Sequence, residues 1–243
     1  MAPATLTSPG PLQGVRGQGT AARAPAIGLT TLAWIAALLV TLPVFVQAPW
    51  VRQAPVGATL FTVPLLAAGV LLQRRGHGIW SAVGTLLVGF SGSWLGGSIF
   101  WGWFREHPLW HLPIEAFALP LALGGWRTPW RLACGFYLGS LAGTATTDLV
   151  MALSGVMQRW PAVVAGPLDQ APRLLHEAGL SLLHPLPLLL IGAAAATLIV
   201  CCRRLWGLGE AQRVAAAALA TTLAVDGLFL TAALTAPRLS GLI

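Results

Sequence analysis

The sequence contains no lysine, and charged residues make up only 9% of its 243 residues, where about 25% is usual for a soluble domain. Apolar residues account for 56% of the chain, and the mean hydropathy is +0.76. So little polar surface cannot coat a soluble core, which excludes disordered, collagen-like, coiled-coil and ordinary cytosolic proteins. The composition therefore predicts an all-α, polytopic integral membrane protein.

Cysteine is scarce, and the familiar catalytic motifs are missing. Cys134, Cys201 and Cys202 have neither a CxxC nor a zinc-finger spacing, and an odd number of cysteines cannot form a closed disulfide framework. Nucleophile elbows, Walker loops and GxGxxG turns are also absent from the sequence. The sequence therefore indicates no catalytic residue, and an enzyme is the least favoured class.

Positive charge is carried entirely by arginine. The 14 basic residues are scattered singly or in pairs between apolar stretches and bring the net charge to +7. No basic stripe could follow a phosphate backbone, so nucleic acid is not an expected partner. Arginines commonly flank membrane spans, where they set the topology. We therefore expect the lipid bilayer as a partner, with other membrane subunits or a homo-oligomer as further possibilities.

Hydropathy divides the chain into a tail and one membrane domain. Residues 1–25 are rich in Pro, Gly, Ala and Thr, which predicts a disordered cytoplasmic tail. Residues 26–236 form the predicted transmembrane domain, because a bilayer core requires about 20 apolar residues per helix. The clear spans are 27–46, 79–101, 132–153, 182–200 and 214–234, and the weaker ones are 56–72 and 112–126.

The weak segment 112–126 leaves two topologies open. It is short and contains Pro113 and Pro120, so it either crosses the membrane or is re-entrant, for about seven or six transmembrane helices. With seven crossings, the arginine distribution favours a cytoplasmic N-terminus and an extracytoplasmic C-terminus. Residues 161–179 mix charged side chains with leucine and valine, which predicts an amphipathic segment lying on the membrane surface.

Small residues at a spacing of four predict the helix interfaces. Gly135, Gly139 and Gly143 form a stripe in the fifth span, and Gly92 and Gly96 form a pair in the third. Lipid provides no hydrophobic drive for helix association, so close backbone approach marks an interface. We expect the third span to pack against the fifth. A homodimer face and a close ligand approach are the alternatives to packing within one subunit.

Ionisable residues in or beside the predicted spans are the functional candidates, because each costs about 2.5–3.5 kcal/mol at a helix centre. Under the seven-span topology, Asp226 lies near the middle of the membrane and the others in its outer half. This clustering predicts a site for a solute or a proton. The candidates are His111, Glu115, Asp148, His184 and Asp226.

Two of these histidines raise the question of a metal or a pigment. His111 and Glu115 are four residues apart, but HxxxE differs from the HExxH of zinc proteases, and no metal site is expected. His111 and His184 could ligate haem or chlorophyll from opposing helices. The sequence assigns no cofactor. If the protein does bind one, haem and chlorophyll are the candidates.

The stretch PLWHLPIEAFALPLALGGW, followed by WRLACGFYLGSLAGTATTDLV, resembles a cyanobacterial family of polytopic membrane proteins known as domain of unknown function 3120. The similarity runs from about Trp34 to Leu234 and is strongest between Trp103 and Asp148. The resemblance implies a cyanobacterial source and a location in the plasma or thylakoid membrane. It brings no activity and no catalytic residues with it.

Two functions from different classes fit these features. The size, the small-residue helix faces and the polar cluster favour a small-solute transport component, although no inverted repeat is evident. The resemblance and the lack of a catalytic motif favour an accessory or assembly factor of a photosynthetic membrane complex, with pigment binding as one option. We expect the transport role.

Overall fold

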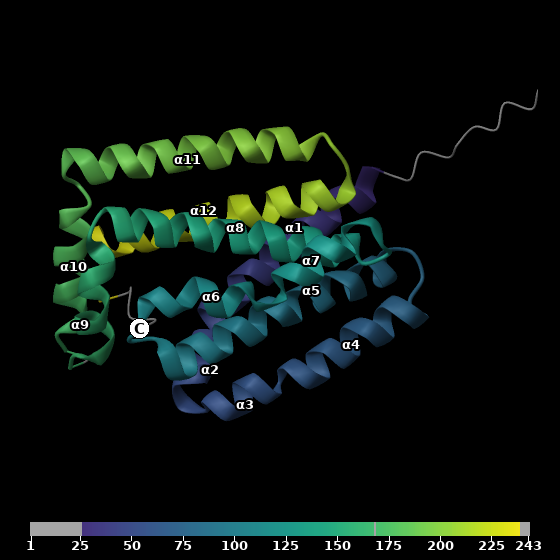
Figure 1. Ribbon diagram of the computed structural model, residues 1–243, viewed down its shortest axis with the longest axis horizontal. Coiled ribbons are helices and arrows are strands. Elements are labelled where there is room, and N and C mark those ends of the chain that lie inside the picture. Colours follow the sequence, from purple (N-terminus) through teal and green to yellow (C-terminus); the bar gives the residue numbers. More distant parts are fainter. Residues whose placement is uncertain (1–25, 168, 239–243) are drawn as a thin grey trace, which may run out of the picture.

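The computed structural model describes residues 26–167 and 169–238, and all regular elements in these ranges are helices. The predicted tail, 1–25, lies outside the described residues. Within the described part, five helices are long and apolar enough to cross a membrane, and Figure 1 shows them running along one common axis. They are Thr30–Gln53, Pro55–Arg75, Ile79–Phe104, Pro185–Trp206 and Glu210–Thr235.

Two of these helices are interrupted near prolines. The first continues to Gln53 rather than ending at 46, because a π-helical turn carries it past Pro43. The second is interrupted at Phe61, since Pro64 has no N–H to donate to the carbonyl of Leu60. The elements are α1 (Ala26–Leu42), the π turn η1 (Pro43–Gln47), α2 (Ala48–Gln53), α3 (Pro55–Leu60) and α4 (Thr62–Arg75).

The third, fifth, sixth and seventh predicted spans are continuous helices. The sixth begins at Pro185 rather than 182, because Pro185 lies at the start of the helix, where its missing N–H removes no helical hydrogen bond. These elements are α5 (Ile79–Ile99) with the π turn η2 (Phe100–Phe104), α8 (Arg131–Leu153), α11 (Pro185–Trp206) and α12 (Glu210–Thr235).

The fourth segment is a broken helix that runs antiparallel to α8. His111 contacts Asp148 near the end of α8, and Gly125 lies against Cys134 near its start. The segment therefore passes along the bundle instead of doubling back. Its pieces are η3 (Pro108–Trp110), α6 (His111–Glu115), η4 (Ala116–Ala118), α7 (Leu119–Gly124) and η5 (Gly125–Arg127).

The core lies where α1, α5, α8 and α12 meet. Phe136, Leu86 and Ala218 have no exposed surface there. The helices α4 and α11 lie outside this core, α4 mainly against α5 and α11 mainly against α12, and most of their side chains remain exposed. Such outward apolar surface suits lipid rather than water.

The glycine stripe of α8 faces α12. A Cβ on Gly135 or Gly139 would overlap backbone carbonyl oxygens of α12, and a Cβ on Gly143 would overlap a threonine there. The residues that are approached on α12 are Ala211, Ala215 and Thr222. The stripe therefore joins the fifth span to the last, whereas the predicted contact between the third and fifth spans uses another face of α8.

The helix α5 does contact α8, but its own glycines make the approach. A Cβ on Gly89 would lie 2.5 Å from the carbonyl oxygen of Ala133, and Gly92 lies against the ring of Tyr137. A helix has several faces, and spacing alone does not indicate which neighbour each face meets. The predicted packing of the third span against the fifth is therefore confirmed, but the glycine stripe of α8 does not form this contact.

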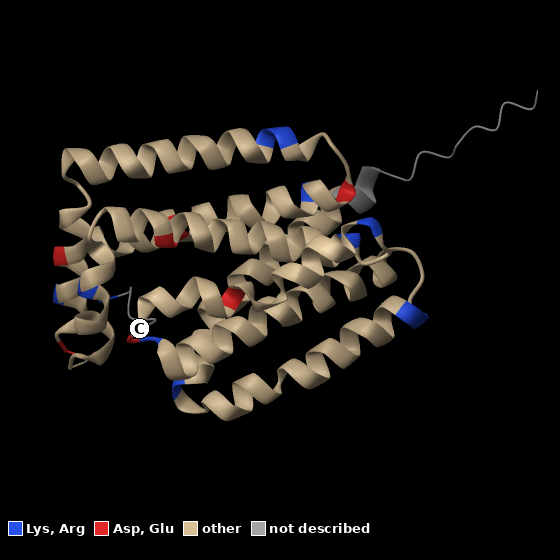
Figure 2. Ribbon diagram, viewed as in Figure 1, with Lys and Arg blue, Asp and Glu red and all other residues tan. Residues whose placement is uncertain are grey.

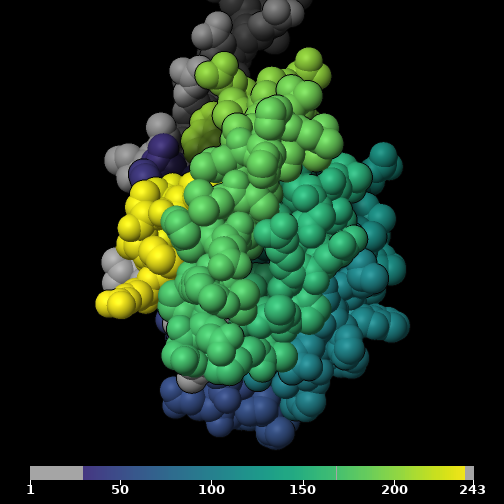
Figure 3. All heavy atoms as spheres, turned by 90° about the vertical axis from the view of Figure 1, so that its left-hand side faces the viewer, coloured from purple at the N-terminus to yellow at the C-terminus, as the bar shows by residue number. Residues whose placement is uncertain are grey.

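Two short α-helices, α9 (Trp160–Ala165) and α10 (Ala171–Ser181), cover one end of the bundle. They follow the 3-10 turn η6 (Val156–Arg159) and replace the single amphipathic segment predicted at 161–179. Figure 3 looks onto this end, where the green atoms of this part of the chain cover much of the face. Figure 2 shows arginines at both ends of the bundle and acidic residues within its body.

Candidate functional site

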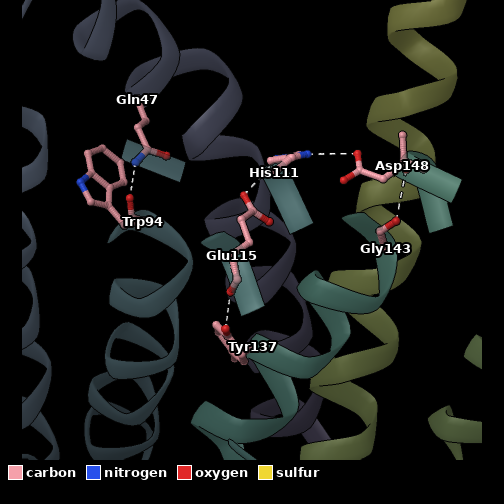
Figure 4. Close-up of polar contacts among 8 residues, drawn as sticks. Gln47, Trp94, His111, Glu115, Tyr137, Gly143 and Asp148 are labelled. Atoms are coloured by element: carbon pink, nitrogen blue, oxygen red, sulfur yellow. Dashed lines mark hydrogen bonds and ion pairs between the residues drawn. The ribbon is translucent and has the colours of Figure 1, made fainter. Parts of the chain in front are cut away.

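His111 lies between two carboxylates. Its Nδ1 is 3.0 Å from Oδ1 of Asp148 on α8, and its Nε2 is 3.4 Å from Oε1 of Glu115 on α6. The side chain of His111 is 20% exposed, that of Glu115 17% and that of Asp148 14%, so the cluster is largely enclosed. Figure 4 shows the imidazole pointing toward both acidic groups. The ring also packs on Phe100, with the ring centroids 4.2 Å apart.

Each ring nitrogen of His111 faces an acceptor oxygen. A neutral imidazole donates from only one nitrogen, whereas an imidazolium donates from both. With a carboxylate oxygen facing each nitrogen, the imidazolium satisfies both contacts at once.

Tyr137 holds the broken fourth segment in place. Its hydroxyl donates to the carbonyl of Glu115 and accepts from the N–H of Ala118 at 3.1 Å. Both groups lie where the helix changes from α6 to η4, just before Pro120, so α8 supplies partners that the helix has lost. Glu115 is positioned through this contact. The sequence analysis missed Tyr137, although it is the single tyrosine of the chain.

Asp226 joins the same cluster from α12. Its Oδ2 is 2.5 Å from the hydroxyl of Thr147, the residue that precedes Asp148. The hydrogen bond connects α8 with α12 at the depth of the His111 contacts. Three carboxylates from α6, α8 and α12 therefore lie around one region.

Gln47 is a second polar residue that the sequence analysis missed. Its side chain is 1% exposed, and its Nε2 donates to the carbonyl of Trp94 at 2.5 Å and to the Ser98 hydroxyl at 2.6 Å. The amide oxygen Oε1 has no hydrogen-bond partner among the described residues. The available signal was a glutamine directly after an apolar run, since amides at membrane depth need partners.

His184 lies apart from the cluster. It precedes α11, its side chain is exposed, and it makes no side-chain hydrogen bond or ion pair within the described ranges. Four of the five predicted candidates are thus brought together, and His184 is not.

A cavity of about 680 Å³ adjoins the cluster. Its walls come mainly from α1, η1, α5, η2, α6, α8, α10, α11 and α12, and most of its surface is apolar. The helix α10 lines it at the end of the bundle seen in Figure 3. The ionisable and amide side chains on its walls are Gln47, His111, Glu115, Asp148 and Asp226.

The site does not favour a metal or a pigment. Among the described residues, no group of three or more His, Cys, Asp or Glu side chains is placed to hold a metal ion. Both ring nitrogens of His111 face carboxylates, so neither is directed at a haem or chlorophyll metal. His111 and His184 also lie apart, so they are not placed to ligate one pigment together.

The apolar helices and the enclosed polar cluster define the class: a polytopic helical integral membrane protein, whose surroundings are the lipid bilayer. Within that class, the chain belongs to the family described as a protein of unknown function, DUF3120, which matches residues 36–234. This match confirms the family that the sequence resemblance indicated. No curated protein and no solved structure matches the chain.

Proposed function

We propose that the protein is a small-solute transport component whose binding site is the cavity beside His111. The observation that carries the proposal is the placement of Glu115, Asp148 and Asp226 on the walls of one cavity inside an apolar bundle. Ionisable groups at membrane depth are expensive and face a partner, a water-filled space or a ligand. A cavity of about 680 Å³ is large enough for a small organic molecule.

The proposal includes seven crossings, with the N- and C-termini on opposite sides. The antiparallel course of 108–127 beside α8 supports a fourth crossing, although this segment is too broken to count as a membrane-spanning helix by itself. Tyr137 and the neighbouring helices satisfy its backbone, as broken helices in membranes require. The arginine distribution supports a cytoplasmic N-terminus, and the cluster then lies in the outer half of the membrane.

Binding of small solutes tests this function. Purified protein in mild detergent would be dialysed against radiolabelled glucose, 3-phenylpropanoate, 2-phenylethanol and 2-phenylethylamine, one at a time. We expect saturable binding of at least one solute, and its loss in Asp148→Asn, which removes a charge from the cavity wall. Asp169→Asn is the matched control, because Asp169 is exposed and does not line the cavity.

Well-folded protein that binds none of the four solutes would contradict the transport role. The accessory-factor alternative makes a different prediction: Asp148→Asn would lower the amount of an assembled membrane complex in cells without any solute being bound. The proposed location, the plasma or thylakoid membrane of a cyanobacterium, rests on the family resemblance alone.

A further inference from the structure

The carboxylates on the cavity wall supply hydrogen-bond acceptors. Glu115, Asp148 and Asp226 supply carboxylate oxygens, and only one oxygen of each is engaged by a described side chain. Gln47 adds the unpartnered amide oxygen. A buried acceptor without a donor is unfavourable, and such groups usually mark the place of a missing partner. The charged groups of the cavity therefore offer acceptor oxygens to a bound donor.

The orientation of the Gln47 amide follows from its contacts. Its Nε2 faces the carbonyl oxygen of Trp94, which can only accept a hydrogen bond. Rotating the amide by half a turn would place two oxygens against each other. The nitrogen is therefore committed to α5, and Oε1, which points away from Trp94 in Figure 4, is buried without a donor in a residue that lines the cavity.

Gln47 and Glu115 approach α5 at neighbouring residues. A Cβ on Gly97 would lie 3.0 Å from Oε1 of Gln47, and a Cβ on Gly96 would lie 3.1 Å from Cα of Glu115. Two consecutive glycines thus allow η1 and α6 to approach α5 at one depth. Gln47 and Glu115, which both line the cavity, are therefore held beside neighbouring residues of α5.

The charged side chains on the cavity wall favour a cationic solute. The described residues that line the cavity include three carboxylates and one histidine but no arginine, and the sequence has no lysine. Even with His111 protonated, the carboxylates are in excess. An anionic solute would face uncompensated like charge in a region of low dielectric, whereas a cation would complete the balance.

We propose that the solute is a small organic amine, bound as its ammonium form. Its N–H groups donate to the carboxylate of Glu115 and, after a small shift of the buried Gln47 side chain, to its Oε1, and its hydrocarbon part lies against the apolar walls. This inference rests on the proposed transport function and gives the chemical class of its substrate.

The three phenyl solutes named above separate this inference from the proposed function, because they share a ring and differ in their polar end. We expect 2-phenylethylamine to bind at least tenfold more tightly than 2-phenylethanol, and 3-phenylpropanoate not to bind. Gln47→Leu and Glu115→Gln should each weaken amine binding at least tenfold. The exposed counterparts Gln158→Leu and Glu177→Gln should leave the affinity unchanged.

Glu115→Gln preserves the shape of the side chain and the backbone carbonyl that Tyr137 contacts, so it keeps the test valid if Gln47→Leu does not fold. Binding of glucose, the acid or the alcohol in preference to the amine would overturn the amine assignment and leave the transport role standing. Unchanged amine affinity in a monodisperse Glu115→Gln protein would also overturn it. Binding of no solute at all would instead contradict the proposed function itself.

Discussion

At the residue scale, one side chain decides how the fourth segment is held. Tyr137 completes the hydrogen bonds of a helix that prolines have interrupted, and it does so from a different helix. The backbone of Glu115 is fixed by this contact, and the side chain of Glu115 faces His111 in consequence. A single hydroxyl therefore links the packing of α8 to the geometry of the polar cluster.

Removing this hydroxyl should destabilise the protein. In Tyr137→Phe the carbonyl of Glu115 and the N–H of Ala118 lose their partner, which costs about 1–3 kcal/mol per buried unsatisfied group. We expect a lower midpoint of thermal unfolding in detergent, measured by tryptophan fluorescence. Thr197→Val is the control, because its hydroxyl is exposed and bonds only to a carbonyl of its own helix. Equal midpoints for both variants would contradict the role of Tyr137.

At the scale of elements, the contact between α8 and α12 depends on glycine. The backbones approach so closely at Gly135 and Gly139 that a Cβ would overlap carbonyl oxygens. The same approach brings Thr147 within hydrogen-bond distance of Asp226. Helix packing and the assembly of the polar site are consequently one feature of the bundle.

A large side chain on this stripe should separate the two helices. We expect Gly139→Leu to destabilise the protein by about 1–3 kcal/mol or more, the cost of overpacking a tight interface. The matched control is Gly192→Leu on α11, where a Cβ meets no atom within 4 Å. Thermal unfolding of both variants in the same detergent makes the comparison. A greater loss in Gly192→Leu than in Gly139→Leu would refute this account of the interface.

At the scale of the whole molecule, the course of residues 108–127 sets the sidedness of everything after it. If the segment crosses, the loop that contains Glu106 and the loop that contains Pro129 face opposite sides of the membrane. A re-entrant segment would return both to one side. The arrangement of the cavity relative to the two compartments depends on this difference.

Cysteine labelling in intact cells distinguishes the two arrangements. In a background without native cysteine, Glu106→Cys and Pro129→Cys place a thiol at exposed positions on either side of the segment. We expect a membrane-impermeant maleimide to label Glu106→Cys and not Pro129→Cys. Gln158→Cys should be labelled like Glu106→Cys, because both positions lie at one end of the bundle. Leu208→Cys should remain unlabelled like Pro129→Cys, because both lie at the other end. Labelling of both Glu106→Cys and Pro129→Cys from outside would refute seven crossings.

Composition and periodicity were sufficient for the class of the protein. Apolar runs of about 20 residues have no stable place outside a bilayer or a large core, so helices at membrane depth followed directly from the sequence. The five long apolar helices agree with five of the predicted spans, including the weak one at 56–72. Their ends shifted by several residues wherever a proline or a π turn altered the helix, because hydropathy does not register such local backbone changes.

The sequence also singled out the residues of the polar cluster, since a charged side chain inside an apolar run is conspicuous by its cost. It could not decide which of them meet. His111 and Asp148 are 37 positions apart, and Thr147 and Asp226 are 79 apart. Only the antiparallel course of the fourth segment and the close approach of α8 to α12 bring these side chains together, and the same packing leaves His184 outside.

What the sequence determined by itself is therefore the environment: a membrane, a set of helices and a short inventory of expensive polar groups. The tertiary structure decided the partners of those groups. It directed the glycine stripe of α8 to α12, gave Tyr137 its structural task, and left one oxygen of Gln47 without a donor. The physical reason is that burial cost is a property of each residue, whereas hydrogen bonding and shape are properties of pairs that the chain brings together only on folding.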